Sequence, residues 1–313
     1  MRLTDAMRIR PKLLWHIGSD YIRDHEVTVV LCVSRFVFLQ KFFAAFEKLT
    51  LPKETCHLLI FLNADNPILK DYLRVSMLRY SSAFASVSVY QAKRHASIEL
   101  IDHKQQRFDH TKLPVIYAMQ RDIMDILKTR RFVMFEDDTL MPSNSIVKLL
   151  RILATHKKCA VATGIETSRA MFRHQAVRLG VHIITRNRNR IVARVSLPPH
   201  LTGLQHVDAC GWYCVASYRN IWKRALIDML SYVRDVPSFG MDNVHTNNIQ
   251  IAGYEILADF SLWCRHLQAS MGKTIEWGKE HAVPQVDLWI PHFEVYAEGL
   301  KIQWQNKFFP KKR

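Results

Sequence analysis

The sequence lacks both a long apolar run and a closely spaced cysteine framework. No stretch of its 313 residues reaches the roughly 18 to 20 apolar residues that a membrane helix needs, and the N-terminal MRLTDAMRIRPK has no apolar centre typical of a secretion signal. The six cysteines are scattered. We therefore expect no transmembrane segment, a cytoplasmic location and reduced thiols. Cys210 and Cys214 suggest zinc as an alternative, although no second close pair accompanies them.

Acidic residues are scarce relative to basic ones. Asp and Glu number 28 against 44 Lys and Arg, which gives a formal net charge of +16. This excess favours a polyanionic partner such as nucleic acid or an acidic membrane, although an ordinary basic protein fits it equally well. Hydrophobic residues make up 49% of the chain, which excludes a disordered protein.

Strand-like and helix-like segments alternate through the first half of the chain. The pattern predicts strands at 27–34, 58–63, 85–90, 131–138 and 159–165, separated by helices at 36–48, 67–80, 113–129 and up to about 155. This alternation predicts an α/β fold with a Rossmann-like, mainly parallel sheet and helices on both faces. Ligands of such sheets bind beyond the carboxyl ends of the strands, which places Ser34, Asn63 to Asp65 and Glu136 to Asp138 at one rim.

The second half has a different pattern. Residues 181–195 predict a β-hairpin around a polar Arg-Asn turn, and residues 206–218 are strand-like. Helices are expected at 219–232 and 241–251, followed by a further strand over 255–266.

Three consecutive acids, Glu136, Asp137 and Asp138, follow the predicted strand RFVMF. Carboxylates crowded at a strand end repel one another unless a cation or hydrogen-bond donors offset their charge. Mg²⁺ or Mn²⁺ takes such oxygen ligands and bridges to a diphosphate, whereas a solvated acidic turn is the alternative interpretation.

The segment RFVMFEDDTLMP resembles the D-x-D region of the GT-A glycosyltransferases, particularly their family 2-like group. The resemblance implies a GT-A fold, a UDP-sugar as donor, and Mn²⁺ or Mg²⁺ as cofactor. By it, Asp138 is the expected metal ligand, Glu136 contacts the ribose or the metal, and Asp137 contacts the sugar or the metal's waters.

Three downstream segments extend the resemblance. SFGMDNVHTNNIQIAGYEI is similar to the family's acidic motif, with Asp242 at the position of the catalytic base; a helix N-cap is the alternative role. His266 in LWCRH matches a histidine that completes the metal site, with a structural histidine as the alternative. HVDACGWYCVASYR resembles the acceptor wall and makes Asp208 and Trp212 candidate acceptor contacts, with core packing as the alternative for Trp212.

The resemblance covers about residues 27 to 266. Ser34, Asn63 and Asp65 are expected to bind the donor, and attack by an acceptor hydroxyl deprotonated by Asp242 implies inversion at the anomeric carbon. We expect an N-terminal extension (1–26), a nucleotide-sugar-binding half (27–165), an acceptor-binding and catalytic half of the same domain (166–268) and a C-terminal extension (269–313).

Arginines mark the acceptor side. Seven arginines and a single acid lie between residues 165 and 200, and Arg186, Arg188 and Arg190 fall in the predicted hairpin. A hairpin whose arginines only contact solvent is the alternative interpretation. Because arginine pairs bidentately with phosphates, the preferred acceptor is a hydroxymethylated pyrimidine in DNA, flipped out as by phage base-modifying enzymes, in a bacterial or phage-infected cytoplasm.

Two other functions stay open. The first is a glycosyltransferase acting on a saccharide, protein or lipid-linked acceptor at a membrane surface. The second is a non-catalytic nucleic-acid-binding module on a degenerate GT-A fold, favoured because Met241 stands where the family usually has Glu before Asp242.

Overall fold

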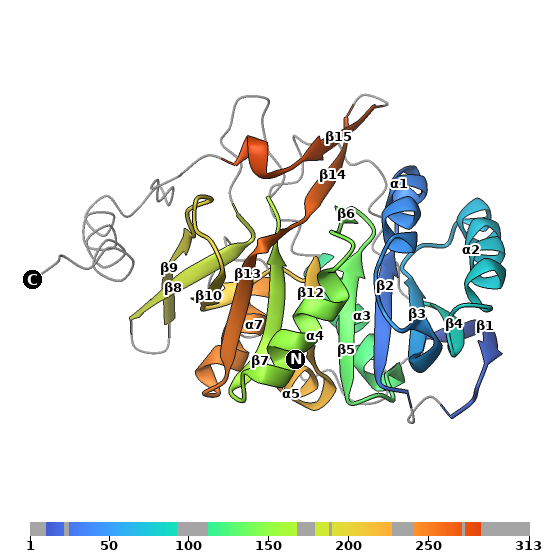
Figure 1. Ribbon diagram of the computed structural model, residues 1–313, viewed down its shortest axis with the longest axis horizontal. Helices are drawn as coiled ribbons and strands as arrows, with labels where there is room; N and C mark the ends of the chain where they lie inside the picture. The colour runs from blue at the N-terminus through green and yellow to red at the C-terminus, as the bar shows by residue number, and fades with distance from the viewer. Residues whose placement is uncertain are drawn as a thin grey trace, which may run out of the picture.

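A nine-stranded sheet forms the centre of the computed structural model, which describes residues 11–21, 25–92, 112–167, 179–187, 190–226, 241–270 and 273–282. The strand order is β1-β4-β3-β2-β5-β12-β7-β13-β10 (Figure 1). The strands are β1 (Lys12–Gly18), β2 (Val27–Val33), β3 (Cys56–Leu62), β4 (Ser86–Gln91), β5 (Arg131–Glu136), β7 (Cys159–Ile165), β10 (Leu204–Val207), β12 (Cys214–Tyr218) and β13 (Glu255–Trp263).

Most of the sheet runs in one direction. Strands β4, β3, β2 and β5 are parallel neighbours, and β13 is parallel to β7. Strand β12 runs antiparallel between β5 and β7, so these two share a direction, while β1 and β10 are antiparallel edge strands. This confirms the predicted mainly parallel α/β sheet and adds one reversed strand at its middle.

Helices cover both faces of the sheet because alternate strand residues point to opposite sides. In β2, Val29, Leu31 and Val33 join one apolar cluster, whereas Val30 and Cys32 join the other. The first cluster packs against α1 (Phe36–Glu47), α2 (Pro67–Tyr80) and α4 (Ser145–Thr155). The second packs against α3 (Lys112–Ile126), α5 (Arg219–Ala225) and α7 (Met241–Ile251).

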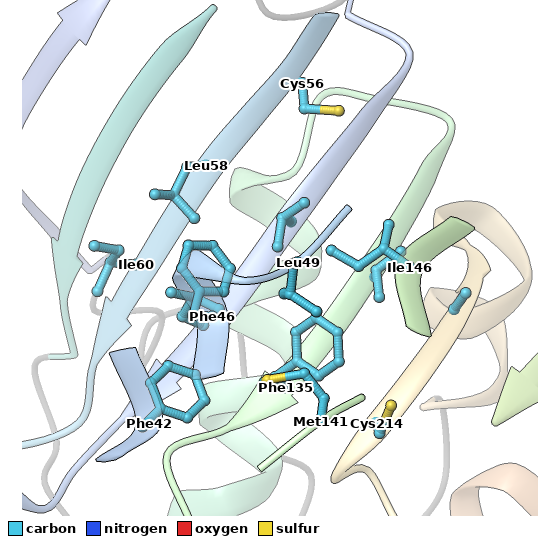
Figure 2. Close-up of a cluster of buried hydrophobic side chains, with 14 of the residues drawn as sticks. Phe42, Phe46, Leu49, Cys56, Leu58, Ile60, Phe135, Met141, Ile146 and Cys214 are labelled. Atoms are coloured by element: carbon cyan, nitrogen blue, oxygen red, sulfur yellow. The ribbon is translucent and has the colours of Figure 1, made fainter. Parts of the chain in front are cut away.

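Aromatic side chains fill the first cluster. Figure 2 shows Phe42 and Phe46 of α1 among the other buried apolar side chains of this cluster. Their rings lie 6.3 Å apart and stacked, and both are fully buried. Burial of two such rings stabilises the α1 side of the sheet by several kcal/mol, at about 25 cal/mol per Å² of apolar surface.

Two three-stranded sheets flank the central one. Strands β11 (Ala209–Cys210), β8 (Val181–Asn187) and β9 (Arg190–Ser196) form the first, in which β8 and β9 are the predicted hairpin. Strands β15 (Lys273–Trp277), β14 (Arg265–Ser270) and β6 (Thr139–Leu140) form the second, near α1 (Figure 1). Strand β6 begins directly after the acidic triplet, so β14 reaches the rim of the main sheet.

Some element boundaries differ from those expected. Residues 206–218 form three short strands rather than one, and the expected strand 255–266 is interrupted at Cys264, where β13 ends and β14 begins. Residues 12–18 add the edge strand β1, and the expected helix 219–232 is described only as far as residue 226. Within the described ranges no helix is long and apolar enough to cross a bilayer.

Candidate active site

The candidate site lies where three parallel strands end. Strand β2 pairs with β5 up to Cys32 and Glu136, and with β3 up to Val33 and Leu62. The next residues along each chain segment therefore gather at one edge of the sheet. This arrangement brings Ser34, Asn63 and the acidic triplet to a common rim, as the alternation of strands and helices predicts.

Asp137 is held by the start of α1. Its Oδ2 accepts hydrogen bonds from the backbone N–H groups of Ser34 and Arg35, each at 2.6 Å, and from the Ser34 hydroxyl at 3.2 Å. The side chain is only 1% exposed. Ser34 and Asp137 thus fix the loop between β2 and α1, and the donor contacts predicted for them stay predictions.

Arg35 is a site residue that the sequence analysis missed. Its guanidinium Nη2 lies 2.5 Å from Asp137 Oδ1 and 2.8 Å from Asp138 Oδ2, and its Nε donates to Asp137 Oδ1 at 3.1 Å. Burial alone would lower the pKa of Arg35, but the charges of Asp137 and Asp138 outweigh it and raise that pKa. The chain therefore supplies one cation of its own to the acidic triplet. In the sequence, only the position of Arg35 directly after Ser34 indicated that it belongs to the site.

Strand pairing brings His266 to Asp138. His266 is opposite Thr139 in the β14–β6 ladder, and the Leu267 N–H donates to the Asp138 carbonyl at 2.6 Å. His266 Nε2 then lies 3.1 Å from Asp138 Oδ2, and both residues are buried. The predicted association of these two residues is present in the structure, and their role as metal ligands stays a prediction.

A hydrogen bond of the second ring nitrogen, Nδ1, fixes the tautomer and the orientation of His266. Nδ1 lies 2.9 Å from the Thr167 carbonyl, which only accepts, so Nδ1 carries a hydrogen. Metal-binding histidines usually hold their other nitrogen in this way. In neutral His266 the Nε2 lone pair faces the Asp138 carboxylate, an arrangement that needs a proton or a metal cation between the two acceptors.

The Asp138–His266 pair fits a divalent ion. Its carboxylate oxygen Oδ2 and imidazole nitrogen Nε2 lie 3.1 Å apart, near enough to bind one ion. Oxygen and imidazole donors suit Mn²⁺. The described residues contain no set of three His, Cys, Asp or Glu arranged for a metal, so the third expected ligand, Glu136, is not brought into such a set.

Glu166 is a second residue that was missed as part of this site. It follows β7, accepts from the Thr139 hydroxyl at 2.7 Å and has Oε2 3.6 Å from His266 Nδ1. Burial raises the pKa of Glu166 to about 8, with His266 opposing and Asp138 adding to the shift. Only the end of β7 at the same rim could have signalled it.

Asn63 and Asp65 come directly after β3. Asn63 is 3% exposed, and its Oδ1 meets no hydrogen-bond partner among the described residues. Asp65 is exposed and accepts from Lys70 at 2.5 Å and from Gln91 at 3.1 Å. A buried amide oxygen left without a donor is costly, so Asn63 suits a ligand that supplies an N–H or O–H group.

Asp242 lies at the start of α7. Its Oδ1 accepts from the backbone N–H of Asn243 at 2.9 Å and from the Asn243 side chain at 3.1 Å. Its Oδ2 would lie 3.2 Å from a Cβ at Gly211. The segment after Gly211 is joined to the triplet, because the Glu136 N–H donates to the Tyr213 carbonyl at 3.3 Å. The segment 211–213 thus links the surroundings of Asp242 to Glu136.

The acceptor-wall candidates make structural contacts. Asp208 Oδ2 accepts from the Ile184 N–H at 2.9 Å, which ties β8 to the turn before β11. Trp212 is 4% exposed, and its Nε1–H donates to His245 Nδ1 at 3.2 Å. Core packing accounts for these contacts of Trp212, and acceptor binding by Asp208 and Trp212 stays a prediction.

Two further expectations concern cysteines and arginines. Cys210 and Cys214 belong to the clusters on opposite faces of the sheet, so their thiols do not share a zinc ion. All six cysteines are free and buried. The Arg186 and Arg190 side chains and the whole of Arg188 lie outside the described part of the chain.

Comparison with known proteins supports the fold. The chain is similar to the solved structure of GalNAc-T7 with UDP, GalNAc and Mn²⁺, at 12% identity and a TM-score of 0.53, over 79% of this chain and 44% of that chain. The fold is that of the GT-A glycosyltransferases. At this identity the likeness to GT-A enzymes concerns the fold alone.

A second GT-A structure gives a weaker match. This is the mannosyltransferase PcManGT from Pyrobaculum calidifontis in complex with GDP-Man and Mn²⁺, at 10% identity and a TM-score of 0.42, over 78% of this chain and 59% of that one. The chain thus spans less than two thirds of either relative. No protein-family profile and no curated sequence matches it.

Proposed function

We propose that this chain is a glycosyltransferase that moves a sugar from a nucleotide-sugar donor to an acceptor hydroxyl. The Asp138–His266 pair supports the proposal most directly, because it lies at the ligand-binding edge of a GT-A sheet with a separation of 3.1 Å and a fixed ring orientation. Mn²⁺ or Mg²⁺ held there would neutralise charge developing on the departing diphosphate. Glu136 and Asp137 complete the acidic rim as candidate donor contacts.

The protein's own groups position the donor and the acceptor. The buried Oδ1 of Asn63 would accept a hydrogen bond from an N–H or O–H group of the nucleotide-sugar. The neighbouring Asp65 is proposed to contact the nucleotide base. Asp242 is the proposed general base. Asn243 orients its Oδ1, and Asp242 would accept the acceptor's proton as the hydroxyl oxygen attacks the anomeric carbon. A single displacement of this kind inverts the anomeric centre.

The acceptor proposed from the sequence is a hydroxymethylated pyrimidine in DNA. It rests on the net charge and on Arg186, Arg188 and Arg190, whose side chains are outside the described residues. Saccharide, protein and lipid-linked acceptors are the alternatives to it.

Labelled donors test the reaction. The protein is incubated with several labelled UDP- and GDP-sugars, Mn²⁺, and plain or hydroxymethylated DNA, and transfer and donor hydrolysis are both measured. Asp242→Asn is expected to lower the rate at least about 100-fold while nucleotide binding is retained, because only the proton acceptor is lost. Asp71→Asn on the exposed face of α2 is the matched control and should behave as the wild type.

The outcomes separate the three functions. Label on hydroxymethylated DNA alone supports the DNA acceptor. Donor hydrolysis that labels no DNA rejects that acceptor but leaves a glycosyltransferase. If no sugar nucleotide is bound or cleaved, a non-catalytic module remains and the proposed function is wrong.

A further inference from the structure

Arg35 forms an ion pair with Asp138 Oδ2, the oxygen that would bind the proposed metal ion. Its Nη2 lies 2.8 Å from Asp138 Oδ2, and the same oxygen faces His266 Nε2 at 3.1 Å. An ion held between Asp138 Oδ2 and His266 Nε2 would lie beside the guanidinium that contacts the same oxygen. Two cations at one oxygen repel each other strongly in a buried site. The ion and the Arg35–Asp138 contact therefore compete.

Arg35 need not leave the site to release Asp138. Its Nε and Nη2 both bond Asp137 Oδ1, and its guanidinium carbon lies 5.0 Å from the centre of the Phe38 ring. Its backbone N–H also donates to Asp137 Oδ2 at 2.6 Å. Nη2 contacts both carboxylates, so the bonds to Asp137 keep the guanidinium at the rim when its contact with Asp138 is lost.

We propose that Arg35 is an internal counter-cation of Asp138 that opposes binding of a divalent ion by itself and favours binding of the ion together with a nucleotide diphosphate. The inference rests on the proposed function. Diphosphate oxygens accept bidentate hydrogen bonds from guanidinium groups, so they would take the donor that Asp138 loses. Ion and nucleotide are then coupled, because each removes a cost that the other would face alone.

Mn²⁺ binding followed by electron paramagnetic resonance tests this role without any activity measurement. Free Mn²⁺ is titrated against the wild type, Arg35→Met and Arg35→Lys, each with and without UDP or GDP. Arg131→Met is the control, since Arg131 pairs with Glu26 at 2.9 Å at the opposite end of β5 from the triplet. Without UDP, Arg35→Met is expected to bind Mn²⁺ at least about tenfold more tightly than the wild type and the control.

Arg35→Lys keeps the test possible if Arg35→Met does not fold. Arg35→Met leaves two buried carboxylates without their guanidinium and is expected to be destabilised, and Mn²⁺ should raise its melting temperature more than that of the wild type. Arg35→Lys keeps a single point charge that cannot match the fork, so its Mn²⁺ affinity should fall between the two. UDP should tighten Mn²⁺ binding by a smaller factor in both variants than in the wild type.

Each result bears on a different proposal. Equal Mn²⁺ affinity of the wild type and a folded Arg35 variant, or an equal effect of UDP on both, overturns the role of Arg35 while the glycosyltransferase stands. Failure of every protein to bind Mn²⁺ together with either UDP or GDP overturns the inference and the proposed function together.

Discussion

Acid should weaken the fold through His245, which lies on the same helix as Asp242. The His245 side chain is fully buried, accepts from Trp212 Nε1–H at 3.2 Å and donates from Nε2 to the Trp222 carbonyl at 3.0 Å. Burial lowers the pKa of His245 to about 4, against a partly compensating effect of the bond to Trp222. The unfolded chain has the ordinary value of about 6.5.

The sign and size of the effect follow from these two pKa values. Above about pH 6.5 the ring is neutral in both states and contributes its full stability. As the pH falls towards about 4 the unfolded state takes up a proton that the folded state excludes, so stability is lost. Between about pH 7.5 and about pH 5 the contribution of His245 to the free energy of unfolding falls by about 2 kcal/mol.

Urea denaturation measures this loss. The free energy of unfolding of the wild type and of His245→Gln is determined at both pH values by circular dichroism. The variant is expected to be less stable at neutral pH but to lose about 2 kcal/mol less on acidification, because glutamine does not titrate. His57, whose pKa burial lowers to about 3, is present in both proteins and cancels in the comparison. An equal loss in the two proteins would refute the reasoning.

Two further substitutions test the neighbourhood of the site. Gly211→Ala places a Cβ 2.6 Å from the Tyr213 ring and 3.2 Å from Asp242 Oδ2, so thermal or urea denaturation should show a loss of about 1 to 3 kcal/mol, and wild-type stability would contradict the packing. Asn63→Leu removes a buried amide whose Oδ1 has no partner within the described ranges, so stability should change little while UDP affinity measured by calorimetry falls about tenfold; unchanged affinity would exclude Asn63 from donor binding.

The order of strands and helices could be predicted because it depends on local periodicity. Runs such as VTVVLCV bury both faces, and their alternation with helices leaves few arrangements besides a mainly parallel sheet. The same argument placed Ser34, Asn63 and the acidic triplet at one rim, because parallel strands end on the same side. The antiparallel position of β12 between β5 and β7 was not predictable, because pairing between distant strands leaves no local signal.

The partners of the acids were determined by tertiary structure. His266 reaches Asp138 across 128 residues through the β14–β6 ladder, and that contact was expected only from the resemblance to GT-A enzymes. Arg35 directly precedes α1, and its ion pairs form with carboxylates that lie about 100 residues away along the chain. Sequence alone thus determined which carboxylates meet at the strand ends. Only the folded chain determined which cation they face, since charge compensation in a buried site is set by contacts between elements remote in sequence.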